Sequence, residues 1–128
     1  MAVERFFGSR KANYRVLLVD DDTKIVEPIA AGLCAEGHMV RSTTHGNELL
    51  RLVELMNPEI VVTGVILEEI DTLEVIPALR RSHPHIKIIA ISGNPHLLAL
   101  AAKHGTNHVL RKPFRLQELN LLIRVAMQ

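Results

Sequence analysis

The sequence lacks several features that would place it in a particular protein class. It contains no tryptophan and a single cysteine, Cys34, so no disulfide can form within the chain. No uninterrupted apolar run approaches the roughly 20 residues that a helix needs to cross a bilayer, and no signal-peptide core precedes Tyr14. We therefore expect a cytoplasmic protein that does not enter the membrane, with Cys34 as a small buried residue of a helix.

An excess of charge of one sign is also missing. Lys and Arg total 15 and Asp and Glu total 14, which leaves a formal net charge of +1 at pH 7. A dedicated DNA-binding domain usually has a stronger positive field, so we expect no direct nucleic-acid binding. The 128 residues fit one compact domain. Neither glycine-rich nucleotide motif, GxGxxG or GxxxxGK[ST], occurs in it.

The chain divides into a short basic segment and one folded domain. Residues 1–14 contain Arg5, Arg10 and Lys11 against the single acid Glu4, without a clear apolar period, and predict a flexible lead-in. Within residues 15–128, short β-branched runs alternate with segments of helical spacing. The predicted strands are Arg15–Val19, Met39–Ser42, Glu59–Thr63, Lys87–Ile91 and His108–Leu110. The predicted helices run from an N-cap at Thr23 to Gly37, over Asn47–Met56 and Leu73–His83, from Asn94 to Gly105, and from Leu116 towards Met127.

This alternation predicts an α/β fold in which an open parallel sheet has helices on both faces. Ligands of such sheets gather at the carboxyl ends of the strands. Asp20, Asp21 and Asp22 follow the first predicted strand, Ser92 follows the fourth, and Lys112 follows the fifth. An acidic cluster suits a hard cation such as Mg²⁺, and a hydroxyl with a lysine suits an anion.

These residues, in their order and spacing, resemble the receiver domain of two-component response regulators. The matching segments are Val16–Asp22, Pro58–Val62, Asp71–Ile76, Ser92–Gly93 and Lys112–Phe114. The resemblance implies a flavodoxin-like receiver fold with strand order 2-1-3-4-5 in a phosphorelay pathway. It also implies that Asp20 and Asp21 hold Mg²⁺ and that Ser92 and Lys112 bind phosphoryl oxygens.

The phosphate-acceptor position departs from the family. An ungapped alignment between Pro58 and Asp71 puts Gly64 where the family has its phosphorylatable aspartate. The switch aromatic of the family is replaced by Val109, whose β-branched side chain has no comparable swing. We therefore expect a signalling module, not an enzyme, that does not accept phosphate. We expect no cofactor beyond weakly bound Mg²⁺, and Lys112 becomes free to pair with a carboxylate after the first strand.

Two alternatives stay open. The first is an active response regulator that is phosphorylated on a substitute carboxylate, Glu68 or Asp71, although loop carboxylates seldom have the positioning that in-line transfer needs. The second is a small-ligand sensor in which the emptied pocket beside Gly64 binds an anion or a metabolite.

The partner surface is predicted from the face that the family uses, which comprises its fourth helix, fifth strand and fifth helix. In the last helix Leu121 and Val125 fall outside the predicted core arc, as Leu98 and Ala102 do in the preceding helix. If these pairs merge into one patch, the expected partner is a second copy of the chain or another protein.

Overall fold

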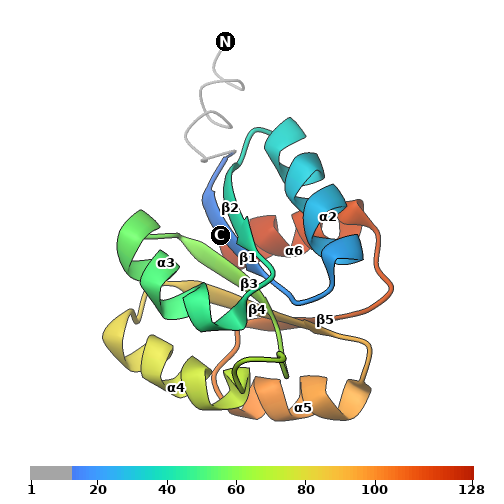
Figure 1. The fold of residues 1–128 in the computed structure, drawn as a ribbon. Coiled ribbons are helices and arrows are strands. Elements are labelled where there is room, and N and C mark those ends of the chain that lie inside the picture. Colours follow the sequence, from blue (N-terminus) through green and yellow to red (C-terminus); the bar gives the residue numbers. More distant parts are fainter. Residues whose placement is uncertain (1–12) are drawn as a thin grey trace.

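A five-stranded parallel sheet between two helical layers forms the core of the computed structural model, which describes residues 13–128 (Figure 1). The strands are β1 (Arg15–Val19), β2 (Met39–Thr43), β3 (Ile60–Gly64), β4 (Lys87–Ser92) and β5 (His108–Arg111). The helices are α2 (Thr23–Ala35), α3 (Leu49–Met56) after a short 3₁₀ turn, α4 (Thr72–Ser82), α5 (Pro95–Lys103) and α6 (Leu116–Ala126). The sheet order is β2-β1-β3-β4-β5, so the predicted fold class and strand order are confirmed.

The central strands are buried on both faces, which explains their nearly continuous apolar sequences. Val16 and Leu18 of β1 pack on one face with residues of α2 and α6. Leu17 and Val19 point to the other face and pack with α3 and α4. The alternation of side chains along the strand therefore divides one apolar run between two cores.

Asparagine and aspartate side chains begin three of the helices. Asp22 accepts a hydrogen bond from the backbone N–H of Lys24 at 3.0 Å, so Asp22, and not Thr23 as predicted, is the N-cap of α2. Asp71 caps α4 in the same way, and Asn94 caps α5 ahead of Pro95. Each cap satisfies backbone donors that the first turn leaves open.

Two expectations about single residues were wrong. Tyr14, placed in the flexible lead-in, is only 8% exposed and stacks on His38, so the folded core begins before Arg15. Residues 1–12 of that lead-in lie outside the described residues. Cys34 is exposed and not buried, because α2 turns its neighbour Leu33 towards the sheet. Within residues 13–128, no helix is both long enough and apolar enough to span a membrane.

Candidate functional site

The carboxyl ends of β1, β3, β4 and β5 bring together the residues that the strand-end argument selected. Lys112, just after β5, has its Nζ 2.7 Å from Oδ2 of Asp20, just after β1. The Asp20 side chain is 1% exposed and that of Lys112 is 23% exposed. The expected direct pairing of Lys112 with an acid of the first strand is confirmed.

The surroundings of Asp20 compensate its burial. Besides the ammonium group of Lys112 at Oδ2, the carboxylate accepts the backbone N–H of Asp22 at Oδ1, at 3.0 Å. A buried carboxylate is costly unless it is both paired and hydrogen bonded. The ammonium group of Lys112 therefore neutralises the charge of the Asp20 carboxylate at this edge of the sheet.

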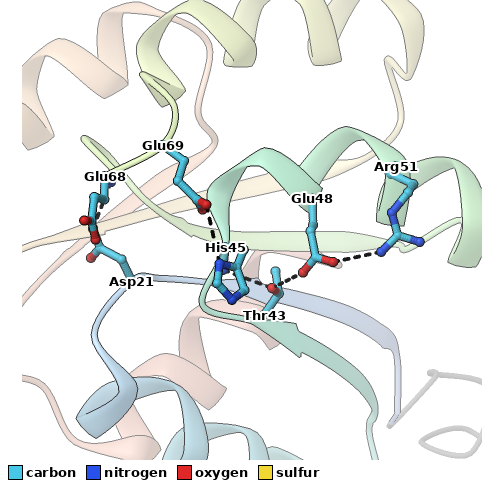
Figure 2. Close-up of polar contacts among 7 residues, drawn as sticks. All are labelled: Asp21, Thr43, His45, Glu48, Arg51, Glu68 and Glu69. Atoms are coloured by element: carbon cyan, nitrogen blue, oxygen red, sulfur yellow. Dashed lines mark hydrogen bonds and ion pairs between the residues drawn. The ribbon is translucent and has the colours of Figure 1, made fainter.

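Asp21 binds the loop that follows β3. Its Oδ2 accepts the backbone N–H of Glu68 at 3.0 Å, and Figure 2 shows the two residues next to each other, joined by this hydrogen bond. The next residue, Glu69, pairs with Nδ1 of His45 at 3.5 Å. Glu68 therefore contacts Asp21 through its backbone, and its exposed carboxylate makes no hydrogen bond or ion pair with Asp20 or Lys112.

The space beside Gly64 is filled. A Cβ built on Gly64 would lie 2.7 Å from Cδ2 of Leu67 and 3.1 Å from Oδ2 of Asp20. Leu67 is 5% exposed and belongs to the core under α3 and α4. The hypothesis of an emptied pocket that receives an anion was therefore wrong in its premise, since an apolar side chain occupies this position.

Comparison of the sequence with protein families assigns the chain to one of them. The profile of the response regulator receiver domain matches residues 16–124. The chain belongs to the response regulator receiver domain family. It is 31% identical over 114 residues to the DNA-binding transcriptional regulator NtrC of Azospirillum brasilense, a match that covers 88% of this chain and 24% of that protein. It is 30% identical over 116 residues to the response regulator MprA of Mycolicibacterium vanbaalenii, covering 89% and 50%. The chain thus spans about a quarter to a half of these relatives.

Known structures agree with the receiver assignment. The receiver domain of NtrX from Brucella abortus superposes with a TM-score of 0.81 at 27% identity, over 88% of this chain and 97% of that one. The beryllofluoride-activated NtrC4 receiver domain dimer gives a TM-score of 0.80 at 26% identity, over 88% and 95%. The chain is therefore a receiver domain of the two-component type in both sequence and fold.

The remaining predicted site residues of this receiver domain are engaged locally. Oγ of Ser92 accepts the N–H of Asn94 at 3.0 Å, at the start of α5. Oδ1 of Asp71 accepts the N–H of Leu73 at 2.9 Å, as the cap of α4. Val109, at the predicted switch position, is apolar and lies in β5 with 37% of its surface exposed. None of these side chains makes a hydrogen bond or ion pair with the Asp20–Lys112 pair.

The donor set of this receiver site does not fit Mg²⁺ well. Residues 13–128 contain no group of three or more His, Cys, Asp or Glu side chains placed to hold a metal ion. Asp20 is already paired with Lys112, and Gly64 contributes no side chain. A cation at this edge would depend on Asp21, whose Oδ2 also accepts the Glu68 amide, and would keep more of its water.

One part of the predicted partner surface was wrong. Leu98 is only 6% exposed and packs against Val65, Ala90 and Ala101, so it belongs to the core. Ala102 is exposed, as are Leu121 at 62% and Val125 at 46%, as expected. Helix α5 has nine residues with leucines at 97, 98 and 100, a pattern that does not determine which side faces the sheet.

A polar cluster beside the site went unnoticed in the sequence. The hydroxyl of Thr43 donates to Glu48, and Arg51 pairs with the same carboxylate at 2.9 Å (Figure 2). The spacing of Glu48 and Arg51 on one helical turn was the available signal, while Thr43 comes from the end of β2.

This cluster predicts an acid-sensitive contribution to stability. The hydrogen bond from Thr43, and then Arg51, lower the pKa of Glu48 below its ordinary value of 4.5. A lowered pKa in the folded state adds stability that is present above pH 4.5 and lost as the pH falls through the folded pKa. We expect Glu48→Gln to reduce the loss of stability on acidification, measured by urea unfolding across this range. Equal profiles for wild type and Glu48→Gln would contradict the assignment.

Proposed function

We propose that this receiver domain does not accept a phosphoryl group and signals by protein contact within a two-component type pathway. The observation that carries the proposal is the structure around Gly64. The third strand ends without a carboxylate, and Leu67 fills the adjoining space. The lysine expected to bind a phosphoryl group is held on Asp20 instead.

The alternative, in which Glu68 or Asp71 accepts the phosphoryl group, has less support. In-line transfer needs the attacking oxygen within a fraction of an ångström or so of its productive position. Asp71 uses its carboxylate to cap α4, and Glu68 reaches the site through its backbone amide. Neither arrangement places a carboxylate beside the Asp20–Lys112 pair.

A mass measurement tests the proposal. The protein is incubated with MgCl₂ and acetyl phosphate, next to the NtrX receiver domain as a parallel sample, and the intact chains are weighed. We expect no phosphoryl adduct on this protein. A stable adduct would refute the proposal, and peptide mapping would then assign it to Glu68, Asp71 or another residue.

The face formed by α5, β5 and α6 is the proposed contact surface. The exposed side chains Val109, Leu121 and Val125 lie on β5 and α6. With valine at 109, the aromatic movement that the resemblance associates with switching has no counterpart, which favours a permanent surface over a switched one. The NtrC4 receiver domain was determined as a dimer, which is an example of a receiver domain that contacts another protein chain, through a surface that need not be this one.

A further inference from the structure

The charges of this chain are segregated along the sheet, although its net charge is close to zero. From β4 to α6, residues 87–128 contain six Lys and Arg against a single acid, Glu118. Residues 13–71 contain four Lys and Arg against eleven Asp and Glu. Because the sheet order is β2-β1-β3-β4-β5, the strands β4 and β5 of the basic segment lie at one end of the sheet and the strands β1 and β2 of the acidic segment at the other (Figure 1). Helix α6 of the basic segment packs on the sheet next to α2.

Lys112 of the basic segment is paired with Asp20, but three of its other cations are not neutralised within the described residues. Lys103 of α5, Arg111 of β5 and Arg124 of α6 are exposed, and within residues 13–128 their side chains have no hydrogen-bond or ion-pair partner. The only acid of the segment is engaged elsewhere, since Oε1 of Glu118 accepts the backbone N–H of Arg115 at 2.9 Å. This end therefore presents a positive potential to approaching molecules.

Apolar side chains accompany the cations. Val109 is 37% exposed, Leu121 is 62% exposed and Val125 is 46% exposed, and they belong to the same elements, β5 and α6. We call these three residues together with Lys103, Arg111 and Arg124 the basic face. Protein interfaces combine apolar side chains at their centre with polar and charged ones at their rim, so exposed apolar and cationic side chains on the same elements suit a protein partner. Proteins that hold single-stranded nucleic acid instead offer exposed aromatic side chains, and Phe114, the one aromatic residue of this segment, packs against the core.

The charge pattern also disfavours a symmetric dimer through this face. A twofold axis places the same surface on both sides of an interface, so the basic face would meet its own cations. Like charges facing each other oppose association and are a device against wrong partners.

We propose that the basic face binds an acidic protein surface with an apolar centre. The inference rests on the proposed function, because it specifies the partner of a domain that signals by contact. Unlike that proposal, it does not depend on whether the domain accepts a phosphoryl group. The occupant is a protein of opposite charge, neither a second copy of this chain nor a nucleic acid.

Binding of defined probes to the full chain tests the proposal. The probes are a synthetic helical peptide with leucines along one side and glutamates elsewhere, an all-glutamate peptide of equal charge, and a duplex DNA. Affinities come from fluorescence anisotropy, and the contact surface from amide chemical shifts. We expect the leucine–glutamate peptide to bind most tightly, to shift signals of α5, β5 and α6, and to weaken as salt is added.

Matched variants distinguish the effect of the basic face on binding from the effect of the net charge. The triple variant Lys103→Glu, Arg111→Glu and Arg124→Glu should weaken peptide binding by about tenfold or more. The control triple variant is Lys24→Glu, Arg41→Glu and Arg81→Glu, which changes the net charge by the same amount at exposed sites outside the basic face. It should reduce the affinity for the peptide much less. Leu121→Ser with Val125→Ser should reduce the preference for the leucine–glutamate peptide over the all-glutamate peptide.

Three results would overturn the proposal. The first is equal weakening by the two charge variants, which would mean that only net charge matters. The second is tighter binding of DNA than of the peptide at the same salt concentration. The third is self-association of the wild-type chain in sedimentation that the first triple variant abolishes. None of these outcomes depends on phosphorylation, so a phosphoryl adduct in the mass measurement and a failure of peptide binding are separate results.

Discussion

Replacing Lys112 by methionine is expected to lower the free energy of unfolding by about 2–4 kcal/mol. The substitution keeps most of the apolar stem and removes the ammonium group that lies 2.7 Å from Asp20. Asp20 is then left buried with one hydrogen bond, from the N–H of Asp22. Losing one partner of a fully buried pair costs more, but part of the Lys112 side chain is exposed and water compensates some of the loss.

A second substitution identifies the cause. On the Lys112→Met background, Asp20→Asn removes the unpaired charge and should recover most of the lost stability, so the two changes are not additive. Urea unfolding of the four proteins at neutral pH measures this coupling. Lys103→Met serves as the control, because its exposed ammonium group has no partner within residues 13–128. If Lys112→Met lowers the free energy of unfolding by less than about 0.5 kcal/mol, the Asp20–Lys112 pair does not stabilise this edge of the sheet.

Gly64→Asp is expected to change the chemistry of the site more than any other single substitution. The new Cβ lies 2.7 Å from Cδ2 of Leu67, the end of a flexible side chain, so Leu67 must rotate away. The new carboxylate also lies near Asp20 and repels it. Without a divalent cation we therefore expect a loss of about 1–3 kcal/mol in stability. With MgCl₂ we expect this loss to be reduced, and acetyl phosphate to add a phosphoryl group.

Gly64→Asn is the matched control for this experiment. Asparagine displaces Leu67 to the same degree and adds no charge, so it separates crowding from electrostatics. We expect MgCl₂ to raise the unfolding temperature of the aspartate variant and not that of the asparagine variant, and only the aspartate variant to gain mass. Equal responses of the two variants to MgCl₂ would mean that the added carboxylate does not complete a cation site with Asp20 and Asp21.

Local patterns in the sequence were enough for the architecture and for much of the site. Apolar runs of strand length and helical spacing are properties of neighbouring residues, so the five strands, their alternation with helices and the outward position of Leu121 and Val125 were predicted. The convergence of Asp20 and Lys112 followed from the rule that parallel strands end at one edge of the sheet.

Contacts between distant segments decided the rest. Leu98 is buried because α5 places it against Val65 and Ala90, and three closely spaced leucines do not indicate which of them faces the sheet. Leu67 fills the space beside Gly64 because the loop after β3 folds back, held by its own backbone hydrogen bonds and by the Glu68 amide on Asp21. The sequence alone therefore determined which chemical groups lie at the strand ends. Tertiary packing decided which of them meet and which space is filled, because both depend on distances between residues far apart in the chain.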